Sequence, residues 1–324
     1  MDVPSTHRSY LKRVALFACI LVVCAVIGLY LGWRYETEKL MNVDDDATTT
    51  DESGDVTWKK DRDGGYWIAN TTSGSNLYAT VLMPNAVSEF LQPLVLVPGG
   101  IGTSGDFLAG QKKDAQTLAD AGYLVVAFDP EGRGRSEGEE DNNGSIGQDG
   151  LAAIVRFASE QSGGQDVGVI SFSYGITLAS GAIARYPDLP VAFLIDWEGP
   201  ADRNDTGGCD VDKTGHLSAI ADCDDEAFWS EREAMGFIDD VTVPYLRLQT
   251  ERDHAQPDVL SAIRMVNAAV GGKSPWVRLN DELENQACAE TSPPDMLPDA
   301  FDRTVMTGIA KYAKTLFVLS RERE

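Results

Sequence analysis

Residues 167–178 read VGVISFSYGITL, and the character of this stretch changes at its middle. The first part, 167–172, is a short apolar run rich in β-branched residues, which is typical of a buried strand. Small residues then surround Ser173, and a helical pattern follows. A serine at a sharp strand-to-helix turn exposes its hydroxyl, and the residues two before and two after it must be small. Gly175 meets this requirement, and Ser171 is also small.

The same alternation of strand and helix continues on both sides of this stretch. Continuous apolar strands that alternate with helices predict an α/β fold, a mostly parallel central sheet with helices on both faces. We expect strands at 94–97, 124–128, 191–196, 245–248 and 276–279, and helices at 111–121, 145–161, 257–270 and 301–320. Earlier β-rich runs, predicted to form an antiparallel meander at one edge, lie at 56–58, 66–69 and 77–83.

The composition limits the classes of partner. The chain has 324 residues and a formal net charge of −24, with 43% hydrophobic residues. The hydrophobic content is ordinary for a globular protein, but the charge is strongly acidic. Such a surface disfavours the phosphates of nucleic acids, so we expect no nucleic-acid partner.

The amino-terminal part of the chain predicts a membrane anchor. Residues 14–33 form an apolar run about long enough to cross a bilayer core of ~30 Å. Basic residues in 1–13 place that end in the cytoplasm and the rest of the chain outside it. Residues 34–55 are acidic and threonine-rich, as in a flexible stalk. An uncleaved signal anchor is favoured over a cleaved signal peptide, because no convincing cleavage site follows the run.

The remaining residues, 56–324, are long enough for one large α/β domain. Residues 198–240 interrupt its strand–helix rhythm and predict an inserted cap or lid. Outside the cytoplasm, Cys209 and Cys223 are candidates for a disulfide that leaves Cys288 over, although spacing alone leaves the pairing open.

Three segments, in order, carry a resemblance to a known family. They are Pro98-Gly99-Gly100, the loop 129–138 (DPEGRGRSEG) and the pentapeptide 171–175 (SFSYG), each directly after a predicted strand. In this order they resemble the α/β-hydrolase superfamily, nearest to its dienelactone-hydrolase, acetyl-esterase and X-prolyl-dipeptidyl-peptidase branches. Residues 243–253 resemble, more weakly, the segment that carries the family's acidic catalytic residue. The resemblance implies an α/β-hydrolase fold and a structural role for the loop 133–136.

The resemblance also implies roles for single residues. Ser173 corresponds to the nucleophile that attacks an acyl carbonyl. The oxyanion that then forms needs preorganised donors, and the family's pattern supplies the backbone N–H of Tyr174 and one from the loop that contains Gly100 and Ile101.

The histidine that should complete a catalytic triad is missing from its usual place. In this family the order is Ser, then acid, then a His after the last strand. The chain has only His7, His216 and His254, and residues 280–286, after the last predicted strand, read NDELENQ.

Three explanations remain open. His254 is itself the base, with Asp253 as the acid that orients it, or Glu284, or an acid after the preceding strand; the candidates there are Asp196 and Glu198. Alternatively, His216 folds over Ser173 from the inserted segment. In the third explanation the protein keeps the fold but has lost the chemistry.

We therefore expect a membrane-anchored, extracytoplasmic serine hydrolase that cleaves an ester or peptide-like acyl bond in a small molecule or a peptide. The expected catalytic residues are Ser173, Asp253 and His254. No cofactor is expected. No metal site is expected either, because the aspartates of 202–225 lack the spacing of a calcium-binding loop. The alternative is a catalytically silent binding or scaffolding protein with the same fold.

Overall fold

The structure is a computed structural model that describes residues 57–84, 91–109, 113–205, 209, 220–256, 258–281, 284–290 and 293–322. The predicted anchor (14–33), the predicted stalk (34–55) and His216 lie outside the described residues. None of the helices in the described part combines the length and the hydropathy of a membrane-spanning segment.

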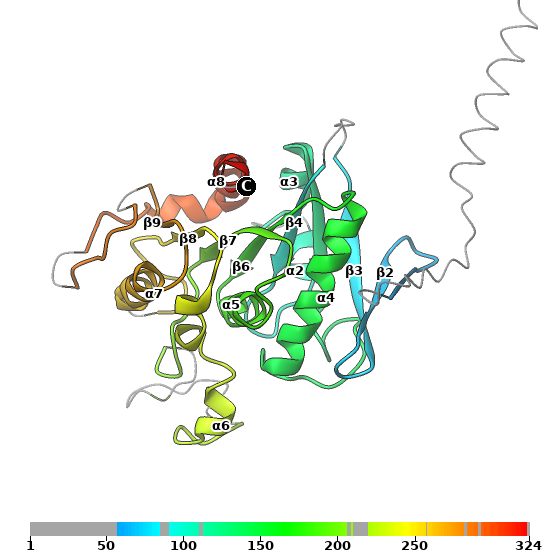
Figure 1. Cartoon of the computed structure of the whole chain (residues 1–324), viewed down its shortest axis with the longest axis horizontal. Helices are drawn as coiled ribbons and strands as arrows, with labels where there is room; N and C mark the ends of the chain where they lie inside the picture. Colours follow the sequence, from blue (N-terminus) through cyan, green and yellow to red (C-terminus); the bar gives the residue numbers. More distant parts are fainter. Residues whose placement is uncertain are drawn as a thin grey trace, which may run out of the picture. The chain divides into compact units, whose positions relative to one another are not determined.

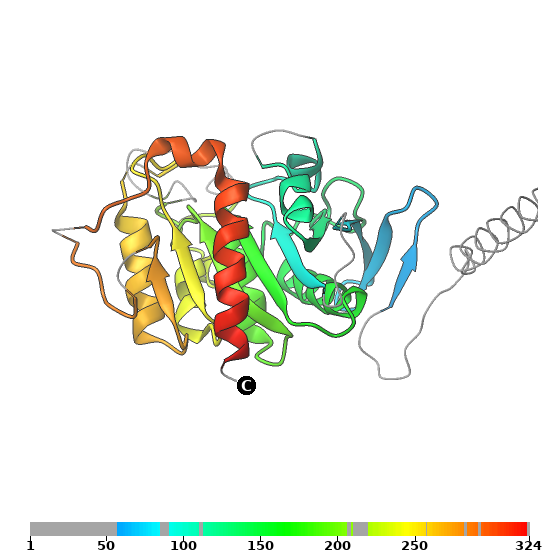
Figure 2. The ribbon, with the colours of Figure 1, turned by 90° about the horizontal axis from the view of Figure 1, so that it is seen from above.

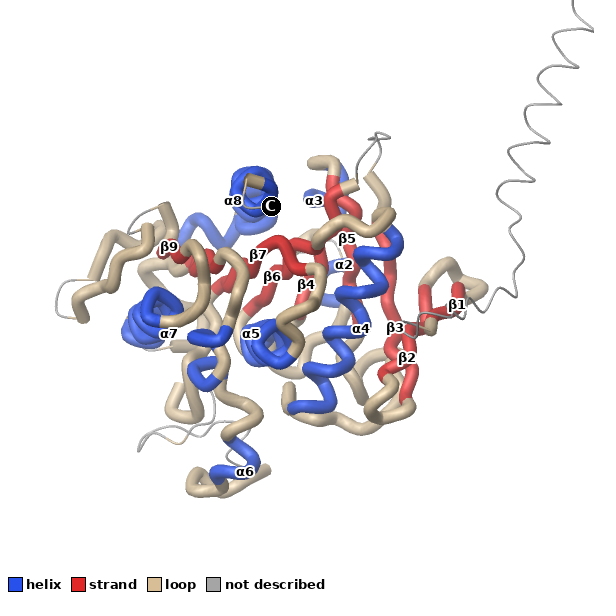
Figure 3. Tube along the Cα trace, viewed as in Figure 1, coloured by secondary structure: helices blue, strands red, loops and turns tan. Residues whose placement is uncertain are grey.

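Nine strands of the described part form one sheet, in the order β1-β2-β3-β5-β4-β6-β7-β8-β9. Their bounds are β1 Trp58–Lys60, β2 Tyr66–Asn70, β3 Ser75–Leu82, β4 Gln92–Val97, β5 Tyr123–Phe128, β6 Val167–Phe172, β7 Val191–Trp197, β8 Tyr245–Leu248 and β9 Val277–Leu279. The pairs β1–β2, β2–β3 and β3–β5 are antiparallel, and every other pair is parallel. The predicted antiparallel edge and parallel centre are both confirmed. Figure 3 shows the strands in red between the helices.

Helices cover both faces of the sheet (Figures 1 and 2). On one face lie α4 (Ser145–Gln161), α5 (Gly175–Arg185) and α7 (Leu260–Gly271). On the other lie α2 (Gly105–Leu108), α3 (Gln116–Asp120) and the carboxy-terminal α8 (Val305–Arg321). Each face buries its own apolar cluster, and the buried residues of the central strands β4, β5, β6 and β7 contribute side chains to both clusters. This pattern explains why these strands are continuous apolar runs in the sequence.

Two predicted helices differ from the observed ones. The helix expected at 111–121 is shorter, because the Asp114 side chain accepts a hydrogen bond from the Gln116 backbone N–H (2.9 Å) and α3 begins there. The unpredicted α2 precedes it. The helix expected at 301–320 is divided into a 3₁₀ helix, η4 (Asp299–Arg303), and α8.

The segment between β7 and β8 contains one short helix, α6 (Glu226–Trp229), and two 3₁₀ turns, η2 (Ala234–Gly236) and η3 (Ile238–Asp240). A disulfide joins Cys209 to Cys223, and Cys288 is a buried free thiol. Trp229 packs against Tyr174, which precedes α5. The role of this segment as a cap stays a prediction.

The register of three neighbouring strands positions the functional site. Phe172 at the end of β6 is paired with Trp197 at the end of β7, which is paired with Leu248 at the end of β8. The next residue of each strand therefore leaves the sheet at the same edge. The carboxyl ends of parallel strands are where ligands bind in open α/β sheets.

Candidate active site

Ser173 occupies the sharp turn between β6 and α5. Its φ of 51° lies in the left-handed region, which a residue other than glycine rarely adopts. Gly175 makes the turn possible, because a Cβ there would lie 2.6 Å from the Pro98 carbonyl oxygen and 2.8 Å from that of Val97. At the other small position, Ser171 is fully buried and its hydroxyl donates to the Ile195 carbonyl (3.3 Å). The strained turn lifts the Ser173 side chain out of the sheet edge.

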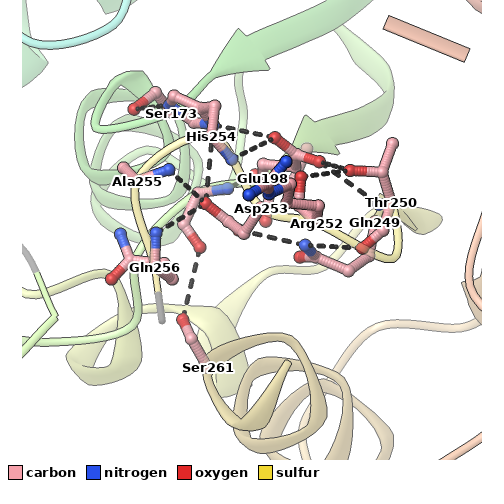
Figure 4. A network of polar contacts seen from close by, with 12 residues as sticks. Ser173, Glu198, Gln249, Thr250, Arg252, Asp253, His254, Ala255, Gln256 and Ser261 are labelled. Atoms are coloured by element: carbon pink, nitrogen blue, oxygen red, sulfur yellow. Dashed lines mark hydrogen bonds and ion pairs between the residues drawn. The ribbon is translucent and has the colours of Figure 1, made fainter. Parts of the chain in front are cut away.

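His254, from the loop after β8, meets this serine. Its Nε2 atom lies 2.9 Å from Ser173 Oγ, and its Nδ1 atom lies 2.8 Å from Glu198 Oε2 (Figure 4). The imidazole side chain is 31% exposed, whereas the Glu198 side chain is fully buried. One side of the imidazole thus contacts the hydroxyl at the surface and the other contacts a carboxylate inside the protein.

Glu198 is held by the same loop that carries His254. Its Oε2 atom also accepts from the His254 backbone N–H (3.2 Å), and its Oε1 atom accepts from the backbone N–H (3.2 Å) and the hydroxyl of Thr250. Burial alone would raise the pKa of Glu198, but these hydrogen bonds from His254 and Thr250 outweigh it and hold the pKa below its ordinary value. Glu198 is therefore a carboxylate at neutral pH.

Asp253, the acid predicted from the sequence, also lies near His254 but makes different contacts. Its Oδ1 atom is 3.5 Å from His254 Nδ1 and accepts from the backbone N–H groups of Ala255 (2.8 Å) and Gln256 (2.7 Å). Its Oδ2 atom accepts from Gln249 Nε2 (3.0 Å). The geometry favours Glu198 over Asp253 as the hydrogen-bond partner of the imidazole, and Asp253 holds the turn that carries it.

The chain order Ser, carboxylate, His is kept, but the carboxylate and the histidine each follow an earlier strand than in the family's usual pattern. Glu198 follows β7 and His254 follows β8, whereas the family pattern predicts the acid after β8 and the histidine after β9. Asn280 follows β9 instead; it is buried, accepts from the Gln249 N–H (2.9 Å) and donates to the Gln249 carbonyl (3.1 Å). The other acids considered from the sequence lie elsewhere: Asp196 pairs with Arg247, and Glu284 pairs with Arg278.

The loop that contains the predicted oxyanion donors Gly100 and Ile101 follows β4 and reaches the turn through Gly99. A Cβ on Gly99 would lie 2.8 Å from the Ser173 Cβ, so the loop after β4 directly contacts the elbow, the sharp turn at Ser173 between β6 and α5. Gly100 has a φ of +54°, and the next residue, Ile101, is 69% exposed. Tyr174 precedes α5, where the first N–H groups of a helix have no intrahelical partner. Its side chain is buried, which raises the pKa of the phenol.

An aromatic side chain also contacts the site. Trp197 stacks on His254, with ring centroids 4.7 Å apart and an interplanar angle of 19°. The Lys113 ammonium lies 4.3 Å from the centroid of the same indole, and burial lowers its pKa. This contact between β7 and the histidine loop further restricts the orientation of the imidazole.

Donor atoms of Glu198, Asp253 and His254 lie within 4.8 Å of one another, a spacing that a metal ion could use. Each of these groups is already hydrogen-bonded within the site, to one another or to the loop that carries the histidine. The arrangement fits an acid–base pair, and we assign no metal ion to it.

Comparisons with known proteins agree with this fold. A family model described as the alpha/beta hydrolase fold matches residues 92–191. No match was found among curated proteins.

Several solved structures are similar. Est1E from Butyrivibrio proteoclasticus with bound ferulic acid is 18% identical, covers 78% of this chain and 99% of its own, and has a TM-score of 0.55. A putative aryl esterase from Burkholderia cenocepacia is 15% identical, with 78% and 99% covered and a TM-score of 0.51. An esterase from Pyrococcus furiosus is 17% identical, with 83% and 91% covered and a TM-score of 0.50. The chain has the α/β-hydrolase fold, as its resemblance to that superfamily predicts.

Proposed function

We propose that this protein is a serine hydrolase that cleaves a carboxylic ester or a peptide-like acyl bond, with Ser173 as nucleophile, His254 as general base and Glu198 as the acid that orients it. The observation that carries the proposal is the unbroken chain of two contacts, 2.9 Å from Ser173 Oγ to His254 Nε2 and 2.8 Å from His254 Nδ1 to Glu198. A nucleophile, a base within hydrogen-bond reach and a group that orients the base are the arrangement that activates a serine.

The reaction follows from these positions. Ser173 Oγ attacks the acyl carbonyl while His254 Nε2 takes the hydroxyl proton, and the Nδ1–H donated to Glu198 stabilises the imidazolium that forms. The N–H of Tyr174 and one from the Gly100–Ile101 loop bind the oxyanion. The imidazolium then gives its proton to the leaving alcohol or amine. Water, activated by His254, hydrolyses the acyl-serine and restores the hydroxyl.

The competing function is a catalytically silent binding or scaffolding protein with this fold. A separation beyond one bridging water favours that alternative, whereas the observed 2.9 Å is within direct hydrogen-bond distance. This contact supports hydrolysis over silent binding.

Carboxylic esters are the first substrates to test, because two of the similar structures are described as esterases. The membrane anchor at 14–33 and the extracytoplasmic position of the globular part stay predictions.

The test is the initial rate of hydrolysis of p-nitrophenyl acetate and butyrate by the native chain, Ser173→Ala and His254→Ala. We expect turnover by the native chain and a decrease in the initial rate on the order of 10³-fold or more in both variants. Equal rates in the native chain and Ser173→Ala would overturn the proposal.

A further inference from the structure

Arg133 is a buried arginine in the loop after β5, outside the triad, and only 6% of its surface is exposed. Its Nη1 atom donates to the Gly100 carbonyl oxygen (2.6 Å). Its Nη2 atom donates to Asn143 Oδ1 (2.7 Å), and its Nε and Nη2 atoms both donate to the Glu140 carboxylate. The guanidinium is therefore fixed on two sides and presents one charged N–H to the oxyanion loop.

Asn143 connects Arg133 to Tyr174 at the elbow. Its Nδ2 atom donates to the Tyr174 carbonyl (2.9 Å), and the residue is buried with a φ of 64°. One arginine is thus connected to both segments that supply the oxyanion donors in the proposed mechanism: directly to the Gly100–Ile101 peptide, and through Asn143 to the first turn of α5.

The bond to the Gly100 carbonyl determines where the next N–H points. A peptide unit is planar and trans, so its C=O and N–H point in opposite directions. When Arg133 binds the Gly100 oxygen, the N–H of Ile101 must point away from Arg133. Gly100 is free to take other backbone angles, since glycine has no Cβ, and without this bond the peptide would be free to rotate. A charged donor on the carbonyl also polarises the peptide and strengthens its N–H as a donor.

We propose that Arg133 is a positioning residue of the oxyanion hole, which holds the Gly100–Ile101 peptide in the one orientation that offers the Ile101 N–H to the tetrahedral intermediate. This inference rests on the proposed function. It also revises the sequence-based expectation that the loop 133–136 is only structural.

Arg135, two residues further along, provides the matched control. It is also an arginine in two ion pairs, with Asp61 and Asp63, and its guanidinium stacks on Tyr78 (3.7 Å to the ring centroid). Its side chain contacts the antiparallel edge of the sheet rather than the oxyanion loop. Its replacement therefore removes the same charge from the same loop without touching Gly100.

The experiment compares Arg133→Met with Arg135→Met in three measurements: kcat, KM on p-nitrophenyl butyrate, and the affinity for an alkyl boronic acid, which forms a tetrahedral adduct with the serine. In Arg133→Met we expect kcat and boronate affinity to fall together by about 10- to 100-fold, while KM changes little. This decrease is smaller than the one expected when an oxyanion donor is removed altogether. Arg135→Met should stay near native values in all three.

The outcomes are separable. A folded Arg133→Met with native kcat and boronate affinity would overturn this inference while leaving the proposed function intact. Equal losses in both variants would assign Arg133 a structural role only and would also overturn it. If Arg133→Met does not fold, Arg133→Lys is compared with Arg135→Lys by the same criteria, since lysine cannot reproduce the fork to Gly100, Asn143 and Glu140. An inactive native chain would instead refute the proposed function.

Discussion

Two carboxylates lie near the Nδ1 atom of His254, and their different contacts indicate different roles. Glu198 faces the imidazole at 2.8 Å from a fully buried position, whereas Asp253 lies at 3.5 Å and accepts backbone N–H groups of its own turn. A buried acceptor fixes the tautomer of the histidine and stabilises its charged form. Asp253 shapes the loop that carries the same ring, and its carboxylate is the more distant of the two.

Replacing each carboxylate by its amide should therefore separate the two roles. We expect Glu198→Gln to lower kcat/KM on the order of 10³- to 10⁴-fold, as loss of the orienting acid does in a Ser-His-Asp triad. Asp253→Asn should cost much less, because an amide oxygen still accepts the N–H groups of Ala255 and Gln256. Steady-state kinetics on one ester decide this, and a larger loss in Asp253→Asn would show that the acid is misassigned.

The lowered pKa of Glu198 also predicts a pH dependence of stability. Its folded-state pKa lies below the unfolded value of 4.5, so ionised Glu198 stabilises the fold fully above about pH 4.5. That contribution is lost as the pH falls through the folded-state pKa. The difference in Tm between the native chain and Glu198→Gln should shrink as the pH falls below about 4.5. Thermal unfolding between about pH 5 and pH 3 tests the sign, and a difference that grows as the pH falls below 4.5 contradicts it.

At the scale of secondary-structure elements, the site depends on three adjacent strand ends rather than on the last strand of the sheet. The ends of β6, β7 and β8 supply Ser173, Glu198 and the loop of His254, in register with one another. Because these strands are neighbours, His254 after β8 reaches both Ser173 after β6 and Glu198 after β7. Asn280, after β9, is then free to bind the backbone of Gln249.

The elbow itself tolerates no side chain at Gly175. A Cβ there would lie within 2.8 Å of two backbone oxygens, which cannot move without shifting β4. We expect Gly175→Ala to destabilise the protein by about 3 kcal/mol, the upper part of the range for overpacking. Gly271→Ala is the control: it ends α7, a Cβ there meets nothing within 4 Å, and helical alanine should stabilise by about 0.5–1 kcal/mol. Denaturant unfolding measures both, and equal stabilities would refute the steric argument.

Arg247 on β8 lies between the loops that carry Glu198 and His254. The residue is fully buried, and its Nη1 atom donates to Asp196 (2.7 Å) and to the Gly199 carbonyl (2.6 Å). Its Nε and Nη2 atoms donate to Gln249, which in turn donates to Asp253. Arg247 therefore connects the loop that carries Glu198 with the loop that carries His254.

Removing the Arg247 guanidinium leaves the Asp196 carboxylate buried without its cation. We expect Arg247→Met to destabilise by about 3–5 kcal/mol. Arg156→Met, which loses a 3.8 Å pair with the exposed Asp188, should cost less than about 1 kcal/mol. Unfolding free energies of the two variants test this. A cost for Arg247→Met no greater than that of the control would show that the cluster contributes nothing.

At the scale of the whole molecule, the sequence was sufficient for the architecture and for two residues that the structure brings into contact, Ser173 and His254. Apolar strands and the elbow pattern predict the parallel sheet, and small residues around Ser173 predict the turn. The Glu198 assignment was harder to reach, because several acids follow strands and only the register between β7 and β8 shows which one faces the histidine. The role of Arg133 was hidden for a similar reason, since a buried bond to a distant carbonyl leaves no pattern in the sequence.

The most direct test of the central claim, a Ser173 hydroxyl activated by His254, is labelling with a fluorophosphonate followed by peptide mass spectrometry. The account predicts one phosphonylated residue, Ser173, in the native chain, no adduct in Ser173→Ala, and a labelling rate in His254→Ala that is lower on the order of 10³-fold or more. An unlabelled native chain, or native-rate labelling of Ser173 in His254→Ala, would contradict it.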